Sequence, residues 1–312
     1  MTDTSRSTVA VVQTAPVIGD TAATVRKAEQ LIREAGANGA EVAVFPEAFI
    51  GGYPKGRSFD TVVGTRTPLG REQYREYFDA AVSLPGPEIE ALAAAAAEAG
   101  VFVVIGVIER DGGTLYCTAV LIDPAAGVVG KHRKLMPTAS ERLIWGFGDG
   151  STLDVADTSA GRVGTAICWE NYMPMLRQAM YAQGVDLYCT PTVDDRPVWQ
   201  ASMTHIALEG RNFVLSACQA LPKAAFPAET EFPQHIGNEH WVIRGGSVII
   251  DPLGNVLAGP VYEEETILYA DIDLADRARG RFDLDVNGHY GRPDVFELRV
   301  NTRPNEGTVF ID

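Results

Sequence analysis

Cys168 stands at a position typical of a nucleophile. It directly follows an apolar strand pattern over residues 162–167 and precedes a turn and a helix that opens at Pro174. Such a turn presents a side chain at the edge of a sheet, near helix-terminal N–H groups that favour negative charge. These conditions lower the pKa of a thiol and make it nucleophilic, and the polar pair Glu170 and Asn171 beside it favours a functional role. The other three cysteines lie within apolar strand patterns and are predicted to be small buried hydrophobes: Cys117, Cys189 and Cys218.

Three charged side chains stand beyond other strand patterns. Glu47 follows a short apolar strand that stops at Pro46, Lys134 ends another strand, and Glu141 follows seven positions later. A glutamate just beyond a buried strand has a raised pKa and serves as a general base and acid. A lysine there stabilises a tetrahedral adduct as a fixed cation. Each residue alone is typical of a solvated surface, but their joint placement favours one shared site.

No histidine has the setting expected of a base for this thiol. The chain has five, each predicted to be a surface residue or a satisfied core residue: His132, His205, His235, His240 and His289. His235 and His240 share a Pro-rich stretch, but neither an HExxH motif nor a matching set of metal ligands accompanies them. The cysteines form no CxxC pair, which argues against a zinc ribbon or a thioredoxin-like site. We expect no metal.

The elements that must position these residues alternate between strand and helix. Strands are predicted at 9–14, 42–45, 101–108, 114–122, 128–132, 162–167, 185–189, 213–218, 246–250 and 266–272, and helices at 20–35, 71–82, 88–99, 174–183 and 197–210. Residues 219–241 are predicted to form a long loop that either shapes the substrate pocket or lies inert on the surface. No break in composition interrupts the chain, which favours one domain with a mixed sheet and covering helices.

Composition limits the function classes. The 312 residues are 46% hydrophobic, enough for a large core. A net charge of −15, from 41 acidic and 26 basic residues, repels phosphate backbones and argues against nucleic acid as a partner. The first residues, MTDTSRST, lack the apolar region of a signal peptide, and no apolar run approaches the ~20 residues that cross a bilayer. We therefore expect a cytoplasmic protein with free thiols and no membrane association.

The four chemical residues lie in segments that together resemble the nitrilase (carbon–nitrogen hydrolase) superfamily, in its true nitrilase branch. The segments are FPEAFIGGYP around Glu47, KHRKLMPT around Lys134, SERLIW around Glu141 and CWENYMP around Cys168. ALEGRNFVLSACQ, GGSVIIDPLGNVLAGP and GHYGRPDVF extend the resemblance over almost the whole chain. It implies an α/β fold, the four-layer αββα sandwich, as a single domain over residues 1–284. It also implies homo-oligomers built from dimers, and the mixed aromatic, apolar and Arg composition of residues 285–312 suits a subunit interface.

The resemblance also implies the chemistry. The Cys168 thiolate attacks a nitrile carbon, Glu47 relays protons, Lys134 and the backbone N–H of Trp169 stabilise the anionic adduct, and Glu141 assists. Water then releases ammonia and the carboxylic acid, without a metal or an organic cofactor. Four aromatic residues are candidates for binding the substrate, the first three from family positions and the last from its place in the sequence: Tyr53, Trp145, Trp169 and Tyr172.

Three alternatives stay open at this point. An amidase of the same superfamily would use the same residues on a carboxamide, although CWEN and the segment GHYGRPDVF favour a nitrilase. A cyanide dihydratase would act on cyanide alone. A non-catalytic binding module is disfavoured by the complete set of Glu47, Lys134 and Cys168.

Overall fold

Strand β1 (Arg6–Gln13) shows by its alternation that the sheet it joins is covered on both faces. Val9 and Val11 lie in one apolar core, whereas Ala10 and Val12 lie in another, because successive side chains of a strand point to opposite faces. All four are fully buried. A strand that is apolar on both faces belongs in the interior of a layered α/β protein.

The computed structural model describes residues 6–305 and 308, and its strands form two sheets. The first sheet has the order β13 (Thr266–Asp273), β1, β2 (Ala40–Val44), β3 (Phe102–Asp111), β4 (Thr114–Asp123) and β5 (Gly127–Arg133). The second has the order β10 (Ala220–Pro222), β11 (Trp241–Ile250), β9 (Phe213–Cys218), β8 (Leu187–Thr192), β7 (Gly161–Thr165) and β6 (Val155–Thr158). Strand β12 (Val256–Tyr262) pairs with β11.

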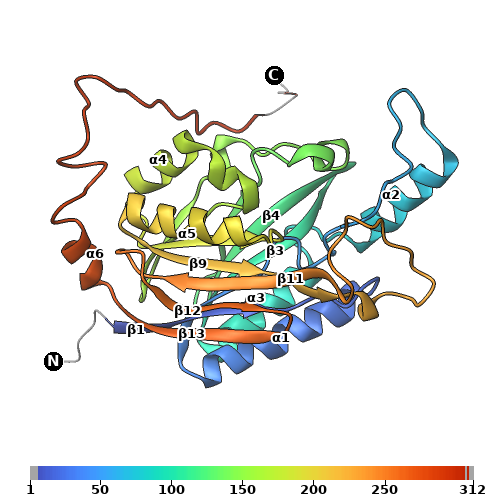
Figure 1. Cartoon of the computed structure of the whole chain (residues 1–312), viewed down its shortest axis with the longest axis horizontal. Helices are drawn as coiled ribbons and strands as arrows, with labels where there is room; N and C mark the ends of the chain where they lie inside the picture. Colours follow the sequence, from blue (N-terminus) through green and yellow to red (C-terminus); the bar gives the residue numbers. More distant parts are fainter. Residues whose placement is uncertain (1–5, 306–307, 309–312) are drawn as a thin grey trace, which may run out of the picture.

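Helices cover the outer face of each sheet (Figure 1). Helices α1 (Thr21–Ala37) and α3 (Pro87–Ala99) cover the first sheet, and α4 (Pro174–Ala182) and α5 (Pro197–Gly210) cover the second. Helix α2 (Pro68–Ala80) projects at one end, in light blue, and α6 (Ala275–Gly280) follows β13. Four short 3-10 helices are η1 (Ala139–Leu143), η2 (Gly150–Thr152), η3 (Cys168–Tyr172) and η4 (Lys223–Ala225).

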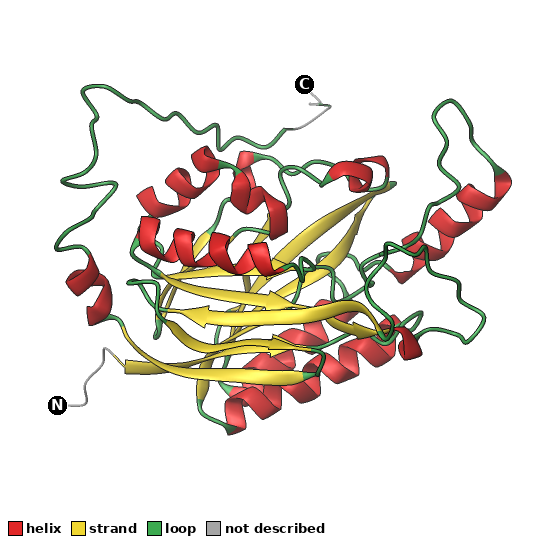
Figure 2. Ribbon diagram, in the orientation of Figure 1, coloured by secondary structure: helices red, strands yellow, loops and turns green. Residues whose placement is uncertain are grey.

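The inner faces of the two sheets share one apolar core. Val42 and Phe102 of the first sheet belong to the same buried cluster as Leu187 and Phe213 of the second. Figure 2 shows the two layers of strands between the helices. The predicted αββα sandwich is therefore confirmed. Within the described residues, no helix is long and apolar enough to cross a membrane.

Several strands end on the same side of the sandwich. Strands β1, β2 and β3 are parallel, and β5 runs with them because β4 is antiparallel to both β3 and β5. In the second sheet β7, β8 and β9 are parallel. Side chains beyond β2, β5 and β7 can therefore converge where the two sheets face each other.

The structure has four strands or α-helices that were not predicted from the sequence. Strands β6 and β12 and helix α6 are additional, and β10 pairs with β11 within the segment predicted to be a loop. Ala220 and Leu221 of β10 are fully buried, so the prediction of a loop is wrong at that end. From Phe226 to His240 the segment has no helix or strand.

The chain beyond Asp285 lies along the helices of the second sheet, with no helix or strand among its described residues (Figure 1). Val286 packs against the core beneath α4, and Nε2 of Gln178 donates a 2.6 Å hydrogen bond to Asn287. Several apolar side chains of this tail are exposed, among them Tyr290 and Phe296. Positions 306–307 and 309–312 of the predicted tail, and positions 1–5 of the N-terminal segment, lie outside the described residues.

Candidate active site

Cys168 lies at a strained turn directly after β7. Its φ angle is 51°, in the left-handed region that non-glycine residues rarely adopt. The side chain of Asn171 holds the turn, because its Nδ2 donates hydrogen bonds to the backbone oxygens of Ala166 (2.9 Å) and Cys168 (2.8 Å). The turn predicted from the sequence is present, and it fixes the thiol at the end of its strand.

Glu47 lies beyond β2 on a segment that crosses closely over β3. Gly106 permits the crossing, because a Cβ atom at that position would lie 2.2 Å from the backbone oxygen of Pro46 and 2.7 Å from Cα of Glu47. The backbone N–H of Phe49 donates to the backbone oxygen of Gly106 at 2.9 Å, and Nε2 of Gln219 donates to the backbone oxygen of Glu47 at 2.8 Å. The backbone around Glu47 is therefore held from both sheets, and the Glu47 side chain is fully buried.

Lys134 joins two carboxylates. Its Nζ donates to Oε1 of Glu47 at 2.6 Å and to Oε2 of Glu141 at 2.9 Å. All three side chains are buried, so the ammonium charge is balanced by the carboxylates and not by bulk water. The second oxygen of Glu47, Oε2, has no hydrogen-bond partner among the described residues and is free to accept a proton.

Glu141 is itself held on both oxygens. Its Oε2 accepts the backbone N–H of Thr138 at 2.6 Å, in the capping box that begins η1, and its Oε1 accepts the Tyr53 hydroxyl at 2.6 Å. These bonds leave Glu141 little freedom to turn away from Lys134. Glu141 therefore fixes the position of the ammonium group.

Thr192, at the last position of β8, contacts the nucleophile directly. Its hydroxyl donates a 3.1 Å hydrogen bond to Sγ of Cys168 and accepts one of 3.0 Å from the backbone N–H of Asp194. Thr192 is fully buried. The sulfur therefore has a hydroxyl donor on the side of the second sheet.

A buried pair, His132 and Glu170, links the thiol turn to the lysine. Glu170 accepts the backbone N–H groups of Ile167, which precedes the cysteine, and of Leu135, which follows the lysine (2.9 Å). Nε2 of His132 lies 2.5 Å from Oε1 of Glu170, and its Nδ1 lies 2.9 Å from the Thr152 carbonyl. Nδ1 faces a carbonyl acceptor and Nε2 faces a carboxyl oxygen, an arrangement that favours the imidazolium form beside a carboxylate. Burial alone would lower the pKa of His132, but the Glu170 charge raises it.

The pKa values show how the nucleophile is poised. Burial raises the pKa of the Cys168 thiol, and the nearby Glu47 charge raises it further. The prediction of a lowered thiol pKa is therefore wrong, because the cysteine begins a single 3-10 turn in a buried setting and helix α4 begins only at Pro174. Burial also raises the pKa of Glu47, against the opposing charge of Lys134. Burial alone would lower the pKa of Lys134, but Glu47 and the other acidic groups hold it well above its usual value.

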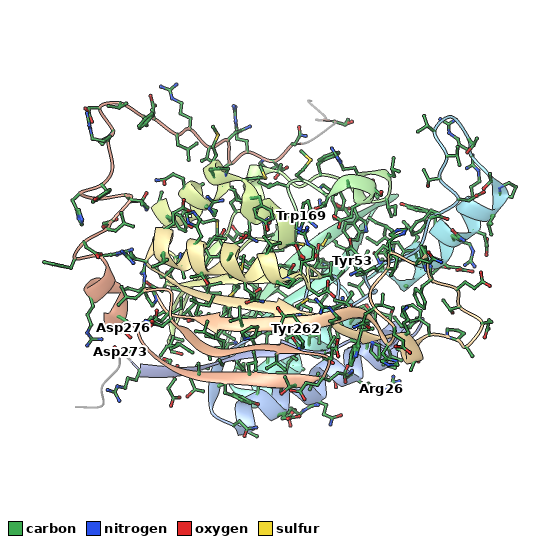
Figure 3. The ribbon with its side chains drawn as sticks, viewed as in Figure 1. Arg26, Tyr53, Trp169, Tyr262, Asp273 and Asp276 are labelled. Atoms are coloured by element: carbon green, nitrogen blue, oxygen red, sulfur yellow. The ribbon has the colours of Figure 1, made fainter. Side chains whose placement is uncertain are left out.

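A pocket of about 490 Å³ opens onto Cys168. Tyr53 and Trp169 both line it and are labelled in Figure 3, and Nε1 of Trp169 donates to Asp194 at 2.8 Å. The 219–241 segment contributes to the same pocket with Pro233, His235 and Ile236. Of the two interpretations of that segment, the structure favours the one in which it shapes the pocket.

The other two aromatic candidates lie outside this pocket. Trp145 is buried behind the site, where its ring centroid is 5.6 Å from Nζ of Lys134 and its Nε1 donates to the Tyr77 hydroxyl at 3.3 Å. Tyr172 lines a different hollow between α4 and α5, and its hydroxyl accepts a bond from Ser202. Trp145 therefore packs beside the lysine, and Tyr172 lines a hollow that does not include the thiol.

Sequence reasoning missed three contacts of the site. Thr192 ends a strand next to that of Cys168, and a hydroxyl at the end of a parallel strand is the signal that would have identified it. Cys117, predicted to be purely structural, places its Sγ 3.5 Å from Oε1 of Glu47. His132 lies only two residues before Lys134 on β5. Cys189 and Cys218 are buried within their strands as predicted.

Within residues 6–305 and 308, no group of three His, Cys, Asp or Glu side chains is arranged to hold a metal ion.

The chain has relatives among known proteins. The family model described as carbon–nitrogen hydrolase matches residues 8–282. The chain belongs to the carbon–nitrogen hydrolase family. The match includes strands of both sheets and ends shortly after α6.

Curated relatives of this carbon–nitrogen hydrolase lie in the nitrilase branch. It is 59% identical over 302 residues to a nitrilase of Bradyrhizobium diazoefficiens, covering 97% of this chain and 94% of the relative. It is 54% identical to a bifunctional nitrilase/nitrile hydratase of Lupinus angustifolius, covering 96% of this chain and 87% of the relative. Among solved structures, the NitFhit protein of C. elegans matches with a TM-score of 0.74 at 20% identity, covering 97% of this chain and 69% of that one. That likeness shows the fold.

Proposed function

We propose that this protein is a nitrilase, which hydrolyses an organic nitrile to the carboxylic acid and ammonia through a covalent bond to Cys168. The observation that carries the proposal is a pocket of about 490 Å³ lined by Cys168, with the buried ion pair of Glu47 and Lys134 close enough for both charges to act on that thiol. Relatives at 59% and 54% identity that bear the name nitrilase support the nitrile as substrate.

Attack on the nitrile begins with a neutral thiol. Because the pKa values of both Cys168 and Glu47 are raised, the thiol keeps its proton until the nitrile carbon is in place, and Glu47 is a stronger base than an ordinary carboxylate. Oε2 of Glu47 accepts the thiol proton as the carbon–sulfur bond forms. The proton then passes to the nitrile nitrogen, which leaves a thioimidate on Cys168.

Charge on the adduct is stabilised by Lys134 and by the backbone N–H of Trp169. Lys134 remains cationic because Glu47 and Glu141 hold its pKa well above the usual value. Its position is fixed by the 2.6 Å and 2.9 Å bonds to the two carboxylates. A buried fixed cation stabilises developing negative charge without reorganising in the transition state.

Water completes the reaction in two steps. Glu47 activates one water, which adds to the thioimidate carbon, and a protonated Glu47 then supplies the proton with which nitrogen leaves as ammonia. The remaining thioester is hydrolysed by a second water, which releases the acid and restores the Cys168 thiol. Tyr53 and Trp169, which line the pocket, contact the substrate in this scheme.

A panel of aliphatic, aryl and arylacetonitrile substrates, assayed for ammonia, tests the proposal. The matching carboxamides and cyanide belong in the same panel, because turnover of amides alone would indicate an amidase and turnover of cyanide alone a cyanide dihydratase. We expect ammonia from at least one organic nitrile, and none from the Cys168→Ala variant. Ammonia release by that variant would refute the role of Cys168.

The same chain is proposed to assemble with copies of itself through its tail. The described part of residues 285–312 exposes Tyr290, Phe296 and Val300, a composition suited to the core of an interface.

The four buried cysteines are unpaired, which supports action in the reducing environment of the cytoplasm.

A further inference from the structure

Thr192 has a geometry that fixes the direction of its hydroxyl proton. The hydroxyl oxygen accepts a hydrogen bond from the backbone N–H of Asp194 at 3.0 Å, and it lies 3.1 Å from Sγ of Cys168. Both bonds are shielded, since Thr192 is fully buried. When the sulfur is a thiolate it has no proton to donate, so the Thr192 hydroxyl is then the donor of this bond, while its oxygen still accepts the Asp194 N–H.

Such a donor matters most when the sulfur carries negative charge, because hydrogen bonds to charged groups are roughly twice as strong as neutral ones. Sulfur is charged in two situations: while the free thiolate exists, and whenever a carbon–sulfur bond breaks and its electron pair returns to sulfur. In the thioimidate and the thioester the sulfur is neutral and a poor acceptor. Thr192 therefore favours the states in which Cys168 leaves the substrate.

We propose that Thr192 is a further catalytic residue, whose hydroxyl stabilises the departing Cys168 thiolate and so sets the share of amide among the products. The part of this inference that concerns products rests on the proposed nitrile hydrolysis.

The two products come from one tetrahedral intermediate, which forms when water adds to the thioimidate and carries OH, NH₂ and the Cys168 sulfur on one carbon. If the carbon–nitrogen bond breaks, the nitrogen takes a proton and leaves as ammonia, the hydroxyl loses its proton, and a thioester remains. If the carbon–sulfur bond breaks, the electron pair passes to sulfur, the hydroxyl loses its proton, and the amide departs. At this branch point only the second route places charge on the atom that Thr192 contacts. The first route does so later, when the thioester is hydrolysed and the choice between amide and acid has already been made.

Thr190 provides a matched control. It lies on the same strand two residues earlier and is equally buried, but its hydroxyl donates to Sδ of Met203 at 3.2 Å. Thr190→Val and Thr192→Val thus remove the same group from neighbouring buried positions. Only Thr192→Val removes a donor from the nucleophile.

Two measurements test the inference. The first is the rate at which iodoacetamide alkylates Cys168, followed by peptide mass spectrometry across pH. Thr192→Val should move the apparent thiol pKa upward and slow alkylation at neutral pH by about tenfold, whereas Thr192→Ser and Thr190→Val should remain near wild type. The second is the amide-to-acid ratio with the nitrile that gives the most amide. Thr192→Val should lower that ratio by about tenfold, and Thr192→Ser should restore it.

An alkylation profile of Thr192→Val that coincides with wild type or with Thr190→Val would overturn the inference, as would an unchanged or increased amide share. Should Thr192→Val fail to fold by circular dichroism, Thr192→Ala removes the same hydroxyl and replaces it in both measurements. The alkylation measurement needs no nitrile. If no nitrile is turned over, the proposed function fails while the bond between Thr192 and Cys168 is still tested.

Discussion

Glu47 and Glu141 are held by a single ammonium group, with Nζ of Lys134 2.6 Å from the first and 2.9 Å from the second. The negative charge of Glu141 is one reason why the pKa of Glu47 is raised, after burial. Because Glu47 must be ionised to accept the thiol proton, activity is lost as the pH falls through that raised pKa. The acid limb of the pH profile therefore lies above the range of an ordinary glutamate.

Glu141→Gln should shift that acid limb to lower pH. The substitution removes a charge that raises the pKa of Glu47, and it also weakens the hold on Lys134, so kcat/KM should fall by about tenfold or more. The measurement is kcat/KM for the best nitrile across pH. Tyr53→Phe is the matched control, because it removes the 2.6 Å bond to Glu141 but leaves the charge in place. An acid limb that stays or moves upward in Glu141→Gln would contradict the coupling.

Cys168→Ala should abolish ammonia release and leave the fold intact, since the thiol is the group that forms the covalent intermediate. In the wild-type protein, iodoacetamide should label Cys168 faster than the three cysteines that lie within strands, because Cys168 lines the pocket. Peptide mapping after brief alkylation measures this. Equal labelling of all four thiols would argue against Cys168 as the nucleophile.

Trp169→Ala and Tyr172→Ala should have different effects although the residues are three apart. Trp169 lines the pocket beside Cys168, whereas Tyr172 lines the separate hollow between α4 and α5. Trp169→Ala should raise KM for a large nitrile by about tenfold, and Tyr172→Ala should leave KM within about twofold of wild type. Steady-state kinetics with large and small nitriles distinguish the two. Equal effects would show that Trp169 does not contact the substrate.

Acid should exceed amide with the best substrate. Around the tetrahedral intermediate, Glu47 supplies the proton for nitrogen and Lys134 holds the charge, so expulsion of ammonia is favoured. A tenfold preference requires only about 1.4 kcal/mol. Poorly fitting nitriles should give more amide, because a rotated intermediate loses contact with Glu47. Chromatography of both products across the nitrile panel measures the ratio, and amide as the main product of the best substrate would refute this expectation.

Truncation at Val286 should reduce particle size and activity. The removed tail carries exposed apolar side chains such as Tyr290 and Phe296, which we propose to lie between subunits. Light scattering and ammonia release from wild-type and truncated protein provide the test. As a control, Phe296→Ser removes one exposed aromatic without shortening the chain and should weaken assembly less. A monomeric wild type, or a truncated protein of unchanged size, would show that the tail folds on its own subunit.

The positions of Glu47, Lys134 and Cys168 could be predicted from the sequence because each lies just beyond the end of a predicted strand. Parallel strands end at the same edge of a sheet, so polar residues just beyond them converge whatever the conformation of the connecting loops. Thr192 escaped prediction because the predicted strand stops at residue 189, whereas β8 continues to Thr192. What distinguishes it is a 3.1 Å contact made across the sheet.

The strands and the helix that were not predicted were missed for a different reason. Strand β12 carries Gly259 and Pro260 and is largely exposed, so it shows neither an apolar run nor a steady alternation. Strand β6 has four residues and helix α6 has six, too few for a periodic pattern to emerge. Such short elements are defined by their partners in space, which a single sequence does not display.

The pair of His132 and Glu170 has one more consequence. Lys134 and Glu47 extend from the first sheet, whereas Cys168 and Thr192 extend from the second, and Glu170 bonds to the backbone beside both Cys168 and Lys134. Since a misplacement of about 1 Å between reacting groups can reduce a rate by about 10²-fold, turnover reports how the two sheets lie against each other. The rate of ammonia release therefore also reports the relative position of the two sheets. It would fall after a small displacement of one sheet against the other, even if every helix and strand stayed intact.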